Sequence, residues 1–157
     1  MSKFFITTPI YYVNDIPHIG HTYTTVAADI IARFYKLKGY DSRLLTGTDE
    51  HGAKIAEAAT KHNKSPQEYS DEIASQYKET WHKLNIDFSR FIRTTDEDHI
   101  KIAQAFLQKL YDNESIDPKP RLYTGQYCVG CEKFLSPDEL TPEGVCPNHL
   151  KPPIEHS

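Results

Sequence analysis

The chain has 157 residues, of which 38% are hydrophobic, and it carries a formal net charge of −4. This length can bury a real core, but it predicts one domain or little more. Lys and Arg are scattered, which excludes a basic block that condenses on nucleic acid, and no apolar run approaches the roughly 20 residues that span a bilayer. We expect no DNA and no membrane as partners, and any RNA contact must be local.

The start of the chain and its cysteines indicate a cytoplasmic protein. The apolar part of the first six residues is too short for a signal peptide, and polar Thr7 and Thr8 end it. Three cysteines are an odd number, which argues against a disulfide framework and suits a reducing compartment.

The first part of the chain predicts a βαβ unit. Phe4–Thr7 is expected to form a short buried strand that ends at Pro9, because Phe and Ile favour strands and Pro cannot continue a ladder. Apolar residues then recur at helical spacing from about Gly20 to Lys38. A second strand over Arg43–Thr46 and a second helix from about Ala53 to Lys61 follow. This order normally means a parallel sheet in an α/β fold.

The middle of the chain is predicted to be helical. Ser65-Pro66-Gln67-Glu68 is a capping box with Pro at the first helical position, which predicts a helix start. The apolar stripe that follows makes Trp81 a core residue and consists of Tyr69, Ile73, Tyr77, Trp81 and Leu84. Residues 91–95 suggest a third short strand, and Asp96 can cap a helix that runs to about Tyr111.

The composition changes after Asn113. Residues 117–120, Asp-Pro-Lys-Pro, form a stiff connector, and the segment after them is short, rich in turns and carries every cysteine. We therefore expect a boundary near residue 115, with one domain over residues 1–114 and the start of another over residues 115–157.

Two unusual motifs follow the first two predicted strands. His18 and His21, separated by Ile19 and Gly20, stand where a helix begins, and there backbone N–H groups and the helix dipole attract phosphate. Gly20 lets a flat ring or a phosphate approach the backbone. The second motif covers residues 47–52. Because open α/β sheets bind ligands at the carboxyl ends of their strands, these loops predict a pocket. A histidine pair at this spacing can also be only a polar helix edge.

Four stretches, in this order and at these distances, resemble the methionyl-tRNA synthetases, a family of class I aminoacyl-tRNA synthetases. They are residues 7–34 with the His-Ile-Gly-His signature, "GTDEHGAKI" at 47–55, "FIRTTDEDH" at 91–99 and the cysteine-rich residues 127–149. The histidine motif alone suggests only the class, whereas "GTDEHG" with the cysteines makes the resemblance specific. It implies the first half of a Rossmann-like parallel sheet with helices, followed by a small zinc-knuckle insertion.

The resemblance also implies a reaction. The family joins the methionine carboxylate to the α-phosphate of ATP, which enters with Mg²⁺, expels pyrophosphate, and passes the methionyl group to tRNA(Met). A carboxylate is already a nucleophile, so the first step needs positioning and charge neutralisation rather than a general base. His18 and His21 are then catalytic and, with Gly20, bind ATP.

The methionine site is likewise implied by the resemblance. Ile10 and Tyr12 would line an apolar slot, and Asp49 would bind the ammonium group, since a desolvated ammonium must be paired. Two structural alternatives remain open from the residues alone, because Asp49 could cap the following helix and Tyr12 could be part of the core.

The cysteines predict a metal site. Cys128-x-x-Cys131 and Cys146-x-x-His149 are two knuckles, and each brings two ligands to one ion. Zn²⁺ takes four such ligands in a tetrahedron, so we expect one structural zinc per chain with no open position for water. His156 competes as the fourth ligand but lies outside the knuckle spacing.

Two other functions compete with this assignment. A small nucleotidylyltransferase can carry a similar His-x-Gly-His before a helix, but it explains neither "GTDEHG" nor the knuckles. A non-catalytic zinc-binding module would have lost its chemistry, and the intact histidine motif with Asp49 argues against that. Residues 115–123 depart from the usual family stretch. The chain also stops before the Lys-Met-Ser-Lys-Ser loop of the family, so we expect an N-terminal fragment that is inactive or weakly active by itself.

Overall fold

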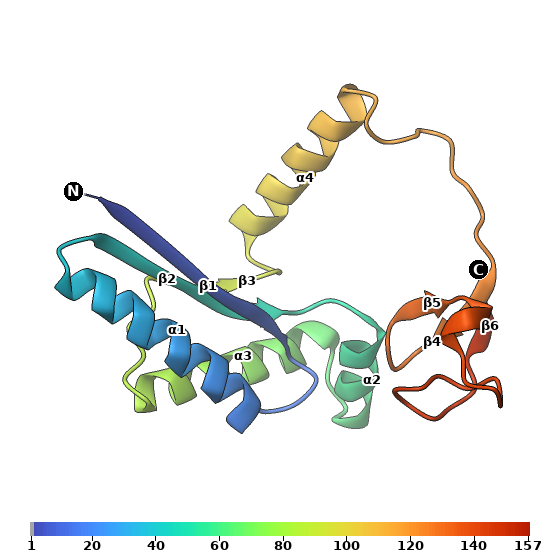
Figure 1. Ribbon diagram of the computed structural model, residues 1–157, viewed down its shortest axis with the longest axis horizontal. Coiled ribbons are helices and arrows are strands. Elements are labelled where there is room, and N and C mark those ends of the chain that lie inside the picture. Colours follow the sequence, from blue (N-terminus) through green and yellow to red (C-terminus); the bar gives the residue numbers. More distant parts are fainter. Residues whose placement is uncertain (1) are drawn as a thin grey trace. The chain divides into compact units, whose positions relative to one another are not determined.

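The computed structural model describes residues 2–157 and divides into two units, one up to Gln108 and one from Lys109 onward (Figure 1). We call the first the α/β unit and the second the knuckle unit. The α/β unit contains a parallel sheet of order β1-β2-β3, confirming the α/β fold class. Its strands are β1 (Lys3–Tyr12), β2 (Asp41–Asp49) and β3 (Arg90–Arg93). The helices are α1 (Ile19–Leu37), α2 (Ala53–Lys61), α3 (Pro66–Lys83) and α4 (Glu97–Asp112), the last of which crosses the division.

The helices agree with the sequence prediction, but the first two strands are longer than predicted. In particular, β1 does not end at Pro9 and continues to Tyr12. The prediction was wrong because β1 is an edge strand of this sheet and Pro9 sits in an irregularity: Thr7 pairs with Leu45 and Ile10 pairs with Gly47. Two residues of β1 thus oppose one of β2, and at such a bulge the missing N–H of proline is tolerated.

The bulge changes which side chains of β1 face the helices. Beyond it, Tyr11 is buried with 6% of its surface exposed, whereas Ile10 and Tyr12 are 41% and 47% exposed. Side chains alternate along a strand, so an inserted residue exchanges the two faces. The bulge therefore turns Tyr11 into the core and Tyr12 to the opposite face.

The core lies between the sheet and the helices. α1 packs on β1 and β2, and α2 packs on α3. The largest fully buried side chains include Trp81 and Tyr77 of α3, which confirms Trp81 as a core residue. The predicted capping box is present, since Ser65 Oγ accepts from the N–H of Glu68. Leu84, in contrast, is 44% exposed because it is the C-cap that follows the last turn of α3.

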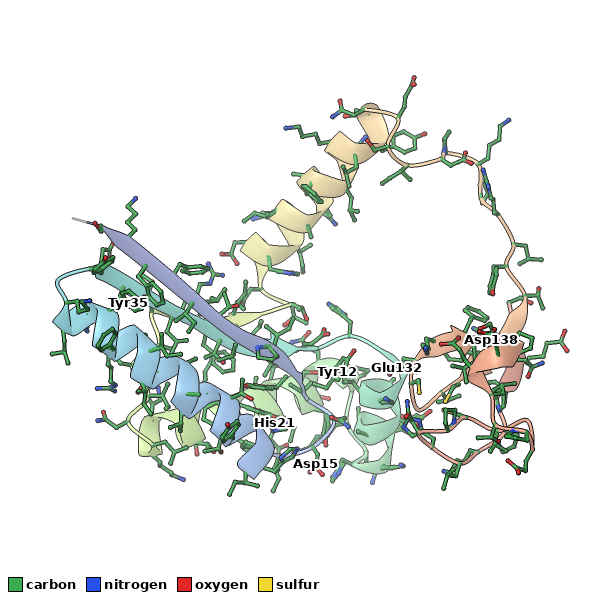
Figure 2. All side chains as sticks on the ribbon, viewed as in Figure 1. Tyr12, Asp15, His21, Tyr35, Glu132 and Asp138 are labelled. Carbon is green, nitrogen blue, oxygen red and sulfur yellow. The ribbon has the colours of Figure 1, made fainter. Side chains whose placement is uncertain are left out.

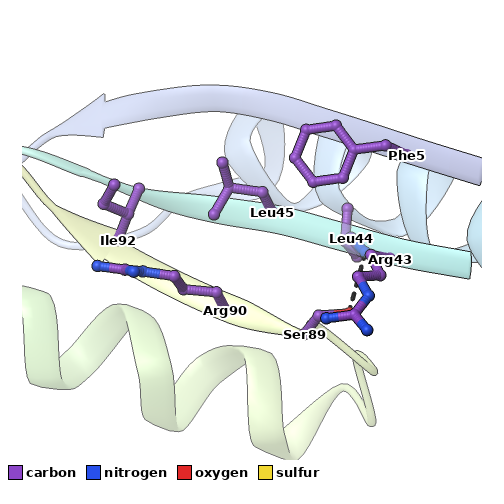
Figure 3. A pocket seen from close by; sticks show the side chains of 7 residues that line it. All are labelled: Phe5, Arg43, Leu44, Leu45, Ser89, Arg90 and Ile92. Carbon is purple, nitrogen blue, oxygen red and sulfur yellow. Dashed lines mark hydrogen bonds between the residues drawn. The ribbon is translucent and has the colours of Figure 1, made fainter.

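On the other face of the sheet, apolar and arginine side chains line a depression of about 430 Å³ (Figure 3). The lining residues are Phe5, Arg43, Leu44, Leu45, Ser89, Arg90 and Ile92. Phe5 is 63% exposed here, so this face is apolar and open within the unit.

The helix predicted after the third strand is present as α4, but no residue of its apolar stripe is buried. Asp96, predicted as its cap, directs its carboxylate to the backbone N–H of Arg93 at 2.9 Å, while its carbonyl accepts the N–H of Ile100. Among residues 2–157, no helix combines the length and the apolar character needed to cross a membrane.

The knuckle unit is built on a small antiparallel sheet of order β5-β4-β6. Its strands are β4 (Gly125–Cys128), β5 (Lys133–Leu135) and β6 (Ile154–His156), with a 3₁₀ turn at Pro137–Glu139. The buried residues of its core are only Cys128, Leu135 and Cys146, with Cys131 and Leu140 packed against them. The unit therefore buries little apolar surface of its own.

Candidate functional site

The histidine motif lies between the end of β1 and the start of α1, and the two imidazoles cap the helix. His18 is the N-cap, and its Nδ1 accepts from the N–H of Gly20 at 3.1 Å. His21 completes a capping box, because its Nδ1 accepts from the N–H of His18 at 3.3 Å. The two rings stack with their centroids 3.7 Å apart. The motif thus forms a defined turn at the start of α1.

This capping geometry favours one neutral tautomer of each ring. A neutral imidazole has one N–H donor and one acceptor nitrogen, and a backbone N–H is directed at Nδ1 of both rings. The capping bonds therefore favour a hydrogen on Nε2 of His18 and on Nε2 of His21. Gly20 permits the arrangement, because a Cβ at this position would lie 2.9 Å from Cε1 of His18.

His21 is held by buried aromatic residues from two other elements. Tyr77 of α3 places its hydroxyl 2.9 Å from Nδ1 of His21, and Tyr11 of β1 places its hydroxyl 3.3 Å from the His21 carbonyl. Thr25 also donates to that carbonyl at 3.0 Å. Burial, and then the nearby His18, lower the pKa of His21 below its usual value. At neutral pH His21 is therefore an uncharged donor.

The residues predicted for methionine lie at the same edge of the sheet. Ile10 pairs with Gly47, and Tyr12 pairs with Asp49, in the parallel register of β1 and β2. Side chains of paired residues point to one face, so Tyr12 and Asp49 are neighbours on the face opposite the core. The core alternative for Tyr12 is wrong, since Tyr12 is 47% exposed. The cap alternative for Asp49 is also wrong: the N-cap of α2 is Gly52, and no side chain caps that helix.

The residue after Asp49 anchors the loop through a network that the sequence analysis missed. Glu50 is buried, and its carboxylate receives Nε and Nη2 of Arg93 at 2.7 and 2.8 Å. The hydroxyls of Thr48 and Thr95 donate to the same carboxylate at 2.6 and 2.5 Å. Arg93 also contacts Asp71 at 2.5 Å, and these carboxylates raise its pKa above the usual value.

This network ties the end of β2 to the end of β3. The backbone N–H of Glu50 donates to Thr94 Oγ1 at 2.9 Å as well. A bidentate arginine–carboxylate pair is rigid as well as strong, so the backbone of Asp49 is held in one place. The sequence held one signal for this pair: Glu50 and Arg93 lie in two of the four stretches that carry the family resemblance.

The four predicted metal ligands come together in the knuckle unit. One ligand atom from each of Cys128, Cys131, Cys146 and His149 lies within 4.8 Å of all the others. His149 Nδ1 is 3.8, 3.3 and 3.7 Å from the three sulfur atoms in that order, and Sγ of Cys131 is 3.6 Å from Sγ of Cys146. The three cysteines are free thiols.

These distances fit a tetrahedral ion. With metal–sulfur distances of about 2.3 Å, a tetrahedron has edges of roughly 3.8 Å, and the separations in this structure approach that value. His156 is not in the cluster: it lies on β6, where its ring contacts Tyr127 at 5.2 Å. The competing ligand set with His156 is therefore wrong.

Comparison with known proteins identifies the family. Residues 4–152 match the family model of the tRNA synthetases class I (M). The chain belongs to this family. A methionine–tRNA ligase of Thermotoga maritima is 51% identical over 153 residues, which are 96% of this chain and 24% of the relative. The corresponding enzyme of Campylobacter jejuni is 47% identical over 144 residues, 92% of this chain and 23% of the relative. The chain thus spans about a quarter of the length of these relatives.

Solved structures agree with this family assignment. The methionyl-tRNA synthetase of Mycobacterium tuberculosis, in complex with methionyl-adenylate, is 35% identical with a TM-score of 0.90. The match covers 99% of this chain and 31% of that one. A LeuRS of Agrobacterium radiobacter, 19% identical with a TM-score of 0.74, shares the fold and covers 99% of this chain and 20% of its own.

Proposed function

We propose that the protein carrying this sequence is a methionine–tRNA ligase that forms methionyl-adenylate from methionine and ATP and transfers the methionyl group to tRNA(Met) in the cytoplasm. The observation that carries the proposal is the imidazole capping box of His18 and His21, which presents two Nε2–H donors at the N-terminus of α1. In the adenylation step a methionine carboxylate oxygen bonds to the α-phosphorus of ATP, and the bond from that phosphorus to the bridging oxygen of pyrophosphate breaks.

The site supplies what this step requires. Negative charge grows on the phosphoryl oxygens, and donors that are already oriented stabilise it without reorganisation. His18 and His21 would donate to those oxygens, and the start of α1 at Gly20 would add backbone N–H groups and the positive end of the helix dipole. Mg²⁺ would enter with ATP as part of the substrate. The neutral imidazole of His21 suits the role, because donation from its Nε2–H needs no change of protonation.

Methionine would bind on the face of the sheet that carries Tyr12 and Asp49. The Asp49 carboxylate would pair with the ammonium group, and Ile10 and Tyr12 would contact the apolar side chain. The Glu50–Arg93 pair supports this assignment, since it fixes the backbone next to Asp49 by contacts at 2.7 and 2.8 Å. A carboxylate held at a fixed position can orient the amino acid so that its own carboxylate faces the α-phosphate.

In the knuckle unit, we infer that the Cys₃His cluster holds one Zn²⁺ with a structural role. Thiolate and imidazole are the ligands that zinc prefers, and a complete set of four leaves no position for a reacting water. The ion would link the two knuckles of a unit that has almost no apolar core.

The test is methionine-dependent exchange of labelled pyrophosphate into ATP, measured on the natural protein at the length that its gene encodes. His21→Ala should lower kcat by about 100-fold with little change in the KM for ATP, as for loss of one transition-state donor. Asp49→Ala should raise the KM for methionine far more than that for ATP, because it leaves the ammonium unpaired. His82→Ala on α3 and Asp41→Ala at the far end of β2 are matched controls.

Two outcomes would contradict the proposal. Exchange that proceeds equally without methionine would point to a nucleotidylyltransferase instead. The absence of exchange by the natural protein, with zinc still bound, would favour a non-catalytic zinc-binding module. A raised KM for ATP with unchanged kcat in His21→Ala would limit the histidine to ground-state binding.

A further inference from the structure

We propose that Tyr77 is a positioning residue for His21, whose hydroxyl holds the imidazole in the tautomer with its hydrogen on Nε2. The consequence for the reaction rests on the proposed function above, whereas the tautomer is a property of this chain and can be tested without any substrate. Nothing in the sequence motifs points to Tyr77, which lies 56 residues after His21 and belongs to a stripe that predicts only core packing.

The contact geometry decides the direction of the hydrogen bond. Nδ1 of His21 lies 3.3 Å from the backbone nitrogen of His18, whose N–H points at it, and 2.9 Å from the hydroxyl of Tyr77. A backbone N–H can only donate, so Nδ1 carries no hydrogen when it accepts that bond. Tyr77 must then also donate to Nδ1. Two donors on one nitrogen both favour the hydrogen on Nε2.

The surroundings of Tyr77 keep its hydroxyl protonated and in place. Its side chain is fully buried, and burial, followed by the charges of Tyr11 and Asp15, raises the pKa of the phenol far above its usual value. The ring stacks on Tyr11 at 5.7 Å and meets Trp81 edge-on at 5.8 Å. A buried ring with aromatic neighbours on two elements has little freedom to turn its hydroxyl away from His21.

The two histidines of the motif therefore differ. His18 is held through Nδ1 by one neighbouring backbone N–H, that of Gly20, within an exposed turn. His21 is held by its ring through Tyr77 and by its carbonyl through Tyr11 and Thr25. Because these contacts come from α3 and β1 as well as from α1, the position of the His21 donor depends on the packed core.

Loss of the hydroxyl should change both the tautomer and the pKa of His21. The titratable groups that face His21 are His18 on α1, Tyr11 on β1 and Tyr77 on α3, with Asp15 of the preceding loop acting on Tyr77. Donation from Tyr77 stabilises only the neutral form with a free lone pair on Nδ1. Its removal should therefore raise the pKa of His21 and populate the tautomer with the hydrogen on Nδ1.

The direct experiment is nitrogen NMR of ¹⁵N-histidine in the chain of residues 1–157, with Tyr77→Phe and, as a matched loss of a tyrosine hydroxyl elsewhere, Tyr35→Phe. Tyr35 stacks on Phe4, near the opposite end of α1 from His21 (Figure 2). Wild type and Tyr35→Phe should show His21 with its hydrogen on Nε2. Tyr77→Phe should show a mixture of tautomers and a higher pKa for His21, with His18 little changed.

Three results would overturn the inference: a hydrogen on Nδ1 of His21 in the wild type, an unchanged His21 spectrum in Tyr77→Phe, or the same change in both variants. The emission of Trp81, the single tryptophan, reports whether each variant is folded. If Tyr77→Phe does not fold, the wild-type spectrum together with a slowly exchanging Tyr77 hydroxyl proton decides the question.

The catalytic consequence is measured on the natural protein. Tyr77→Phe should lower kcat for methionine-dependent pyrophosphate exchange by about tenfold, because a donor that is less well oriented stabilises the developing charge less, with little change in the KM for methionine. A changed NMR spectrum with unchanged kcat would reject the catalytic role of Tyr77. No exchange by the wild type would reject the proposed function while leaving the tautomer result intact.

Discussion

A single residue, Gly47, allows β2 and β3 to approach closely where the candidate methionine site begins. Gly47 lies on β2 two residues before Asp49, and a Cβ at this position would be 2.0 Å from the carbonyl oxygen of Ile92 on β3. No real side chain tolerates such a contact with a backbone atom. Glycine is therefore needed here for close approach rather than for an unusual φ angle, and the approach allows Arg93 to reach Glu50.

Gly47→Ala should destabilise the α/β unit by about 3 kcal/mol or more, because β3 must move away from β2. Gly39→Ala is the matched control: Gly39 has a φ of +82° but nothing within 4 Å of its added Cβ, so it should cost only about 1 kcal/mol. Urea unfolding followed by the emission of buried Trp81 measures both variants. Equal losses in the two variants would show that the contact with Ile92 is relieved without cost.

At the scale of an element, β1 serves two purposes because of its bulge. Before the bulge Thr7 pairs with Leu45, and after it Ile10 pairs with Gly47. The bulge absorbs one extra residue, so that beyond it Tyr11 pairs with Thr48 and reaches the core, where it contacts His21, while Tyr12 lies beside Asp49. One strand thus contributes to both halves of the candidate site, and the bulge keeps both halves in register with β2.

Deletion of Pro9 should therefore leave both faces of β1 in place. Without Pro9, Thr8 opposes Thr46 in a regular ladder and Ile10 stays opposite Gly47, so Tyr11 still points into the core and Tyr12 still lies beside Asp49. We expect the deletion variant to keep cooperative unfolding of the α/β unit. Pro9→Ala keeps the residue count at an exposed edge position and should change stability by less than about 1 kcal/mol. Thermal unfolding monitored by near-UV circular dichroism measures both variants, and a deletion variant without a cooperative transition would refute this register.

At the scale of the whole molecule, the two units are stabilised by different means. The α/β unit has a continuous core that includes Trp81, Tyr77, Leu44 and Ile55. The knuckle unit has three buried core residues, two of which are cysteines of the candidate metal site. A unit that buries so little apolar surface depends on a cross-link or an ion, and the free thiols exclude a disulfide in this structure.

Metal analysis of protein purified without chelator should give one zinc per chain, and chelation should unfold the knuckle unit alone. Amide NMR signals from about Tyr123 to His156 should collapse, while the emission of Trp81 stays unchanged. His149→Ala should weaken zinc binding strongly, whereas His156→Ala, which lies outside the cluster, should keep one zinc. No metal together with a Cys128–Cys131 disulfide would instead indicate a redox pair.

The sequence by itself determined the local elements and the motifs, because these depend on neighbours along the chain. Helical spacing and the Ser65–Glu68 capping box predicted α1 and α3, and the Cys-x-x-Cys and Cys-x-x-His spacings predicted the four clustered ligands. Strand propensity gave the wrong end for β1, at Pro9. The sequence cannot show that a proline lies in a bulge of an edge strand, where it is tolerated.

Only the tertiary structure decided the contacts that join distant segments. The Glu50–Arg93 pair spans 43 residues and the Tyr77–His21 contact spans 56, and neither follows a periodic pattern. Packing of β3 beside β2, and of α3 beneath the histidine turn, brings these groups within hydrogen-bonding distance. Residue type and spacing therefore determined which groups are available for chemistry. The fold determined the partners of those groups, because hydrogen bonds and burial depend on distances between elements.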